Sequence, residues 1–226
     1  GWQRRRSWTG VAFGLMVIKP QLGLLLPFVL IAARQWGILA VAVMTVLVLA
    51  LFSTLLLGTG IWHDHAAILP LFNRFAHEKF APYAAMVASP YVSLHLMGAP
   101  LFIAAWAQAT ISLFVLLVIL NLFAHPHQGS PCLRFGLLAC GILLATPHSM
   151  VYDTPLLAIA TATLFMVAWR KGWADSFEMG AFVIILLMPF LQPLLMQYGV
   201  AVSWLFLLVF FAALLRRYRM EFQPIN

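Results

Sequence analysis

The sequence predicts an all-α protein, a polytopic bundle of transmembrane helices that includes short broken helices and re-entrant hairpins. Of the 226 residues, 64% are hydrophobic and only 8% are charged, whereas soluble domains carry roughly 25% charged residues. Several apolar runs reach the ~20 residues that a helix needs to cross a hydrocarbon core. The ten-residue alternation of a membrane β-barrel is not seen in the sequence, so we expect the spans to be helical.

The charged residues indicate membrane topology rather than a nucleic-acid partner. The net charge is +7, but the cations flank the apolar runs, as cations do at the cytoplasmic ends of membrane spans. We therefore expect a lipid bilayer, and no nucleic acid, as a partner. Cys132 and Cys140 have neither a metal-ligand spacing nor a disulfide framework, and we expect both to be small core residues.

Two apolar runs predict complete membrane spans, from Gly37 to Leu57 and from Pro100 to Phe123. Gly58 and Gly60 are expected to end the first span, because glycine disfavours continued helix. The stretch between the two spans, residues 61–98, is more polar and is expected to form a loop.

Three other apolar segments are too long for one comfortable crossing: Trp8 to Ala33, Leu133 to Trp169, and Met179 to Leu215. The first would measure about 39 Å as one straight helix, at 1.5 Å per residue. We expect each segment to be a hairpin. The predicted breaks are "KPQ" in the first, "TPHSMVYDTP" in the second and "PFLQP" in the third.

The hairpins determine which side of the membrane each cation reaches. With three hairpins, only Lys19, Arg74 and Lys79 lie on one face. The opposite face, which the positive-inside rule makes cytoplasmic, carries Arg4, Arg5, Arg6, Arg34, Arg134, Arg170, Lys171, Arg216, Arg217 and Arg219. The tips of the first two hairpins and the loop of residues 61–98 are then expected on the outer side.

The first hairpin places an ammonium beside a helix start. Pro20 is suited to the first helical position, which would leave the N–H groups of Gln21, Leu22 and Gly23 without intrahelical partners. Together with the Lys19 ammonium, these donors predict a phosphate-binding site at the membrane boundary. The alternative is that Lys19 only extends to the outer surface from a kinked helix.

The second hairpin has the same design. Thr154 is a candidate cap and Pro155 a candidate first helical residue. The polar residues just ahead of them are His148, Ser149, Tyr152 and Asp153. His148 is either a donor to a phosphoryl oxygen or a satisfied loop histidine, and Asp153 is either a site residue or a helix cap.

Aromatic residues interleave with cations in the predicted outer loop, which is the pattern of an interfacial amphipathic helix. Aromatic rings also stack on sugars, so a glycan contact is the alternative. These residues are Trp62, Phe72, Arg74, Phe75, His77, Lys79, Phe80 and Tyr83. Further along, Ser89 followed by Pro90 predicts a capped helix start, and Gly98 predicts its end.

The sequence does not support a metal site or the catalytic motifs found in soluble enzymes. His63, Asp64 and His65 are metal-ligand types, but successive residues rarely face one ion and no further cluster joins them, so we expect no metal. The sequence has no GxGxxG, Walker lysine loop, G-x-S-x-G or HExxH motif, which argues against nucleotide and protease chemistry.

Three stretches in order, "GLMVIKPQLGLLLPFVLIAARQW", "SPYVSLHLMGAP" and "LLATPHSMVYDTPLLAIA", resemble glycosyltransferase family 87, the mannosyltransferase-like membrane proteins also known as domain of unknown function 2029. Lys19 and Gln21 match the lysine-proline-glutamine motif of that family. The stretch from Pro147 to Asp153 matches a segment in which relatives tend to carry a histidine pair. Tyr152 and Asp153 stand in its place here.

The resemblance implies a bundle of the GT-C superfamily type in a bacterial cell (inner) membrane. It implies transfer of a hexose, mannose by analogy, from a polyprenyl-phosphate sugar to an extracytoplasmic lipid or glycan acceptor, without a cofactor. Lys19, Gln21 and His148 would then bind the donor phosphate. Ser149, Tyr152 and Asp153 would line the substrate pocket.

The resemblance also bears on the general base. Enzymes of the GT-C superfamily typically use an acidic residue in the first outer loop, and Asp64, Glu78 and Asp153 do not match its position. We therefore expect residues 1–226 to be a single transmembrane domain, the C-terminal part of a longer enzyme whose base lies outside this stretch. The alternatives are a transporter or flippase for a lipid-linked or anionic substrate, which predicts two matching halves, and a non-catalytic membrane subunit.

Overall fold

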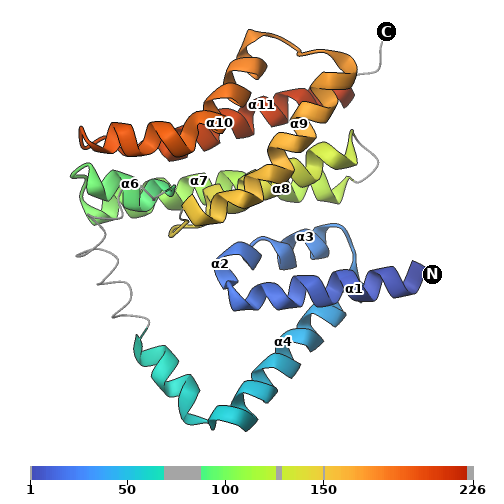
Figure 1. Cartoon of the computed structure of the whole chain (residues 1–226). Coiled ribbons are helices and arrows are strands. Elements are labelled where there is room, and N and C mark those ends of the chain that lie inside the picture. The colour runs from blue at the N-terminus through green and yellow to red at the C-terminus, as the bar shows by residue number, and fades with distance from the viewer. Residues whose placement is uncertain (1, 69–87, 126–128, 150, 223–226) are drawn as a thin grey trace. The chain divides into compact units, whose positions relative to one another are not determined.

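The part of the chain that the structure describes is folded into α-helices and short 3₁₀ turns (Figure 1). The structure, a computed structural model, describes residues 2–68, 88–125, 129–149 and 151–222, and these residues contain no strand. They form two compact units, Gly1–Tyr83 and Ala84–Asn226, and each unit is described by itself. The predicted all-α fold class is confirmed. The single domain stays a prediction.

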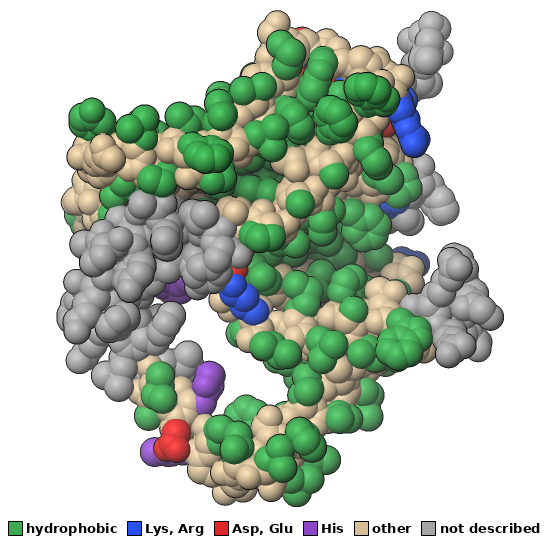
Figure 2. Space-filling model, viewed as in Figure 1, with side chains coloured by type: hydrophobic (Ala, Val, Ile, Leu, Met, Phe, Trp, Pro, Cys, Tyr) green, Lys and Arg blue, Asp and Glu red, His purple; other side chains and the backbone are tan. Residues whose placement is uncertain are grey.

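Three helices of the described residues are long and apolar enough to cross a membrane: α4 (Trp36–Leu57), α7 (Leu101–Ala124) and α10 (Ser176–Met196). Both predicted complete spans are thus confirmed, and Gly58, with φ of 80°, ends α4 as expected. Large hydrophobic side chains are exposed on all three helices, and Figure 2 shows such side chains over much of the visible surface. Surfaces of this kind are suited to contact with lipid.

The first unit contains the predicted hairpin. The chain runs through α1 (Trp2–Leu15) and the 3₁₀ turn η1 (Met16–Ile18), then reverses into α2 (Pro20–Gly23) and α3 (Leu26–Ala32) (Figure 1). The break lies at Lys19, so the predicted interruption at "KPQ" is confirmed.

Helix α1 packs closely along α4 because glycines face the contact. A Cβ added at Gly14 would lie 2.5 Å from the Cβ of Thr45, and one added at Gly10 would lie 2.6 Å from the Cβ of Val41. Such distances are well inside van der Waals contact, so side chains larger than hydrogen would force α1 away from α4.

The second unit is built around α8 (Pro131–Ala145), whose residues 136–145 are all buried. It contacts α7, α9 (Leu157–Lys171) and α11 (Ser203–Phe222). The 3₁₀ turn η3 (Val151–Leu156) joins α8 to α9, so the second predicted hairpin is confirmed.

A short helix, α6 (Pro90–Leu96), lies against α7. Its start is capped by Ser89, whose Oγ accepts a hydrogen bond of 3.3 Å from the Val92 N–H. Gly98, with φ of 91°, follows the helix end. The predicted helix start and end are both confirmed.

The third hairpin breaks at a different place from the one predicted. Helix α10 continues through Pro189 and Pro193, and the chain reverses only at residues 197–202, where Gly199 has φ of 72°. The predicted break at "PFLQP" is therefore wrong. Proline removes only its own backbone donor, and membrane helices often accommodate that loss.

Gln192 connects the two arms of this hairpin. Its side chain is fully buried, and its Oε1 accepts hydrogen bonds from the N–H groups of Val202 (3.3 Å) and Ser203 (3.0 Å). These are donors at the start of α11, where helical N–H groups have no intrahelical acceptor. One glutamine on α10 therefore caps the next helix.

Replacing Gln192 with leucine should lower the free energy of unfolding by about 2 kcal/mol, because two largely buried N–H groups lose their acceptor. Denaturant titration of the detergent-solubilised chain measures the change. Gln197→Leu is the matched control, since Gln197 is exposed and should tolerate the change within about 0.5 kcal/mol. Equal stability of the two variants would contradict the capping role.

The two cysteines differ in burial. Cys140 is buried, as expected, and its Sγ lies 3.5 Å from the Leu207 carbonyl oxygen. Cys132 is exposed, so the expectation that it is a core residue is wrong. It lies in the first turn of α8, ahead of the buried positions that begin at Leu133.

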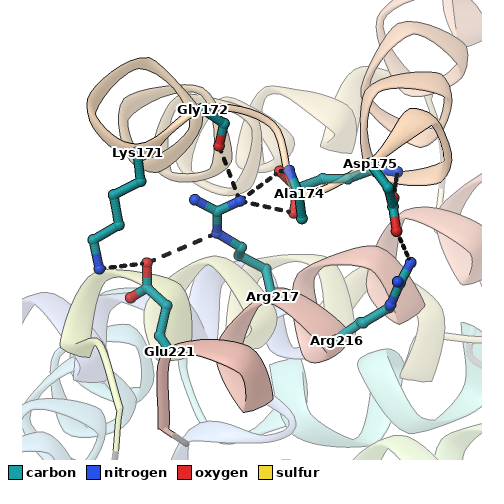
Figure 3. Close-up of polar contacts among 8 residues, drawn as sticks. Lys171, Gly172, Ala174, Asp175, Arg216, Arg217 and Glu221 are labelled. Carbon is teal, nitrogen blue, oxygen red and sulfur yellow. Dashed lines mark hydrogen bonds and ion pairs between the residues drawn. The ribbon is translucent and has the colours of Figure 1, made fainter. Parts of the chain in front are cut away.

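Ion pairs fasten the loop between α9 and α10 to the end of α11 (Figure 3). Arg217 Nη1 donates to Glu178 Oε1 and to the Gly172 carbonyl oxygen, both at 3.1 Å. Lys171 Nζ lies 3.0 Å from Glu221 Oε1. The ends of α9 and α11 thus bring several of the predicted cytoplasmic cations together at one end of this unit. The side of the membrane that this end faces stays a prediction.

Asp175 caps α10 in the same loop. Its Oδ1 accepts a 2.9 Å hydrogen bond from the Glu178 N–H, and its carboxylate pairs with Arg216. The pKa of Asp175 lies below its ordinary value, first because of that backbone hydrogen bond and also because of Arg216. The cap is therefore charged at neutral pH, which suits a helix N-terminus.

Candidate functional site

The first candidate group surrounds Lys19 at the tip of the first hairpin. Lys19 is half-buried and links η1 to α2, with φ of −132° and ψ of 75°. Its N–H donates to the Met16 carbonyl oxygen at 2.9 Å, which closes η1. Pro20 occupies the first turn of α2, as predicted. Lys19 and Gln21 therefore stand on either side of a proline that starts a new helix.

The prediction that three backbone donors are free at this tip is wrong for the Leu22 N–H. The Leu22 N–H donates to the Lys19 carbonyl oxygen at 2.9 Å, so it is not available to a ligand. Helix α2 is also only four residues long, and a single turn tightened by such a bond has little dipole to offer an anion. Any anion binding at this tip must therefore depend mainly on the Lys19 ammonium.

An apolar cavity of about 470 Å³ lies beside this tip, between α1, α2, α3 and α4. Pro20, which follows Lys19 directly, lines it. No charged side chain contributes to its walls, which include Phe13, Val17, Leu24, Leu39 and Val43. The first unit thus places a cation next to an apolar space large enough for part of a lipid chain.

The second candidate group lies in the turn between α8 and α9. His148 is half-buried, and its ring contacts Tyr91 edge-on, with 5.8 Å between ring centroids. Ser149 is fully buried, and its carbonyl oxygen accepts a 3.0 Å hydrogen bond from the Ala88 N–H. Its Oγ has no hydrogen-bond partner among the described residues. Asp153 is buried, with 4% exposed; the Tyr152 side chain lies outside the described part of the chain.

The predicted cap of α9 is wrong. The helix begins at Leu157 without a side-chain cap, and Pro155 lies inside η3. Neither Thr154 nor Asp153 therefore caps α9. The physical reason is that the chain winds first into a 3₁₀ turn, which supplies its own short-range hydrogen bonds and delays the α-helical start.

Two residues that the sequence reasoning missed position this turn. Gln108 on α7 accepts from the Tyr91 N–H at 3.2 Å and donates to the Leu144 carbonyl oxygen at 2.9 Å. Ser112 Oγ donates to the Ala145 carbonyl oxygen at 3.0 Å. They satisfy carbonyl groups at the end of α8 and hold α6 against it. An isolated glutamine in an apolar span was the available signal, because polar residues inside membrane helices usually have a specific partner.

The remaining candidates of the sequence follow α4 in a segment where residues 60–68 are helical, so the predicted loop is wrong for these residues. His63 and Asp64 are exposed, with 3.8 Å between Nδ1 and Oδ1. The described residues contain no group of three or more His, Cys, Asp or Glu that could hold a metal ion. Trp62 Nε1 donates to Thr54 Oγ1 at 2.8 Å. The other aromatic and basic residues of the predicted amphipathic helix, Phe72 to Tyr83, lie outside the described residues.

The structure thus brings the candidate residues together in two groups. Lys19 and Gln21 share the tip in the first unit, and His148, Ser149 and Asp153 share the turn in the second. Convergence of the two groups on one ligand stays a prediction.

Comparison with protein families matches residues 1–147 to glycosyltransferase family 87. No curated protein matches the chain, and no solved structure does. The matched region contains the Lys19 motif, α6, α7 and α8, and it ends just before His148. Because the match covers well over half of the sequence and includes the motif that carries the resemblance, the chain belongs to glycosyltransferase family 87.

Proposed function

We propose that this membrane glycosyltransferase moves a hexose, namely mannose, from a polyprenyl-phosphate sugar to an extracytoplasmic lipid or glycan acceptor in a bacterial cell membrane. Family membership supports the general activity, a sugar donor and acceptor in a membrane setting. The finer assignment rests on one observation: Lys19 directly precedes Pro20, and Pro20 lines an apolar cavity in the same unit. A phosphate joined to an isoprenoid chain has the matching chemistry.

The proposed reaction is a single displacement. An acceptor hydroxyl oxygen attacks the anomeric carbon, the bond from that carbon to the phosphate oxygen breaks, and the hydroxyl proton passes to a general base. The leaving phosphate gains negative charge, which the Lys19 ammonium stabilises. Gln21 is proposed to donate a hydrogen bond to the same phosphate, and His148 is proposed as a hydrogen-bond donor to a phosphoryl oxygen. Ser149, Tyr152 and Asp153 are proposed to line the sugar pocket.

The test uses the full-length gene product in lipid nanodiscs. It is incubated with polyprenyl-phosphate mannose and a membrane glycolipid extract, and products are analysed by mass spectrometry. We expect a product heavier by one hexose. Nucleotide-activated mannose is the matched donor control and should yield no product without the lipid donor. Transfer from the nucleotide sugar alone would contradict the proposed donor.

The same assay distinguishes the alternative function, transport of a lipid-linked sugar, from hexose transfer. A transporter or flippase would move the lipid-linked sugar across the bilayer and leave its mass unchanged. A folded protein that produces no hexose adduct with any polyprenyl donor would favour that alternative or a non-catalytic subunit.

A further inference from the structure

A second hollow lies on the surface of α9, near its C-terminal end. It has a volume of about 380 Å³ and is lined by Phe165, Met166, Trp169 and Arg170. These positions are spaced i, i+1, i+4 and i+5, so they form one face of the helix. Trp169 is 80% exposed. Three apolar side chains and one guanidinium thus border an open space.

The apolar wall of this hollow is held in place by aromatic contacts. Phe165 stacks on Phe182 of α10, with 6.0 Å between ring centroids. Trp173 contacts the same Phe182 ring at 5.2 Å. Phe165 also lies 5.9 Å from the Trp169 ring. The wall is therefore preorganised before any ligand arrives.

No acidic side chain among the described residues pairs with Arg170. Three other cations at this end of the unit are paired: Lys171 with Glu221, Arg216 with Asp175, and Arg217 with Glu178. Arg170 is exposed and makes no hydrogen bond, ion pair or ring contact within the described residues. The exposed Arg170 guanidinium is therefore accessible to an anion.

We propose that this face of α9 binds an anionic phospholipid, with its phosphate on the Arg170 guanidinium and an acyl chain along Phe165, Met166 and Trp169. A lipid fits better than a soluble anion, because three of the four lining side chains are apolar. Tryptophan beside a cation is also typical of the boundary between headgroups and acyl chains. The site is separate from the proposed transferase turn, since the 15 residues of α9 span about 22 Å.

Lipid retention measures this site directly. The chain is reconstituted in nanodiscs that contain equal amounts of phosphatidylglycerol and phosphatidylcholine, and bound lipids are counted by native mass spectrometry. We expect phosphatidylglycerol to be retained over phosphatidylcholine. Arg170→Gln should reduce that retention about five-fold, because a basic residue near the surface contributes roughly that factor to binding of an anionic lipid. Arg170→Lys should keep most of it.

Arg219→Gln is the matched control. Arg219 is also an exposed cation near this end of the unit, at the end of α11, but it does not line the hollow. Arg219→Gln should leave lipid retention unchanged. The thermal unfolding midpoints of Arg170→Gln and Arg219→Gln should both stay close to that of the unmodified chain. Equal losses in Arg170→Gln and Arg219→Gln would show diffuse attraction and overturn the proposal. Equal retention of the two lipids by the unmodified chain would overturn it as well.

Discussion

Replacing Lys19 with alanine is expected to lower the rate of hexose transfer by about 100- to 1,000-fold, the usual cost of removing one group that stabilises developing charge. Lys19 carries the positive charge at the tip of the first hairpin, and one of the neighbouring backbone donors, the Leu22 N–H, is already bonded to the Lys19 carbonyl oxygen. Few other groups at this tip can therefore replace the ammonium. The nanodisc assay with polyprenyl-phosphate mannose measures the change in kcat.

Two further variants separate charge from folding in this experiment. Lys19→Arg keeps the positive charge and should retain more transfer than Lys19→Ala. Gln21→Ala removes only a neutral hydrogen-bonding group, so its loss should be smaller than that of Lys19→Ala. The unfolding midpoint of all three should stay close to that of the parent protein, because Lys19 is only half-buried. Near-normal transfer by folded Lys19→Ala would refute the assigned role of Lys19.

Replacing Arg217 with methionine should reduce the free energy of unfolding by about 3 kcal/mol. The side chains of Arg217 and Glu178 are only 6% and 3% exposed, so the variant leaves a carboxylate buried without its partner. Loss of one member of a buried pair typically costs 3–5 kcal/mol, and we expect the lower end because the pair lies near the helix termini. Denaturant titration in detergent micelles measures the loss.

The double variant Glu178→Leu/Arg217→Met tests whether the pair itself or the orphaned charge is responsible. Because both buried charges are then absent, the double variant should be more stable than Arg217→Met alone. Arg219→Met serves as an exposed control and should be nearly neutral. A double variant less stable than either single change would contradict this account and indicate that the ion pair contributes strongly by itself.

Much of the fold could be predicted because its causes are local. Predominantly apolar runs of about twenty residues produced α4 and α7 where they were expected. Pro20, Ser89 and Gly58 also act through their own backbone geometry or through neighbours a few residues away. For the same reason, the turn that carries Lys19 and the turn that carries His148 were both predicted, and family membership supports the first.

Two predictions were wrong, the break at "PFLQP" and the start of α9, because the local sequence pattern did not decide the conformation there. Two prolines in "PFLQP" gave a break signal as strong as that of "KPQ", yet α10 continues through both of them. Thr154 and Pro155 had the residue types of a helix start, but a 3₁₀ turn occupies that position. Propensities state what each residue tolerates, and packing against neighbouring helices selects among the tolerated conformations.

The sequence by itself determined that this protein is a helical membrane protein, where its main spans lie, and which family motif it carries. Only the tertiary structure decided that Gln192 caps α11 and that Gln108 holds Tyr91 and the end of α8. It also decided that Lys171 pairs with Glu221, while no acidic partner of the adjacent Arg170 lies among the described residues. Hydropathy and spacing describe each segment separately. Partners such as Gln108 and Leu144 lie 36 residues apart, and only the folded chain brings them within hydrogen-bonding distance.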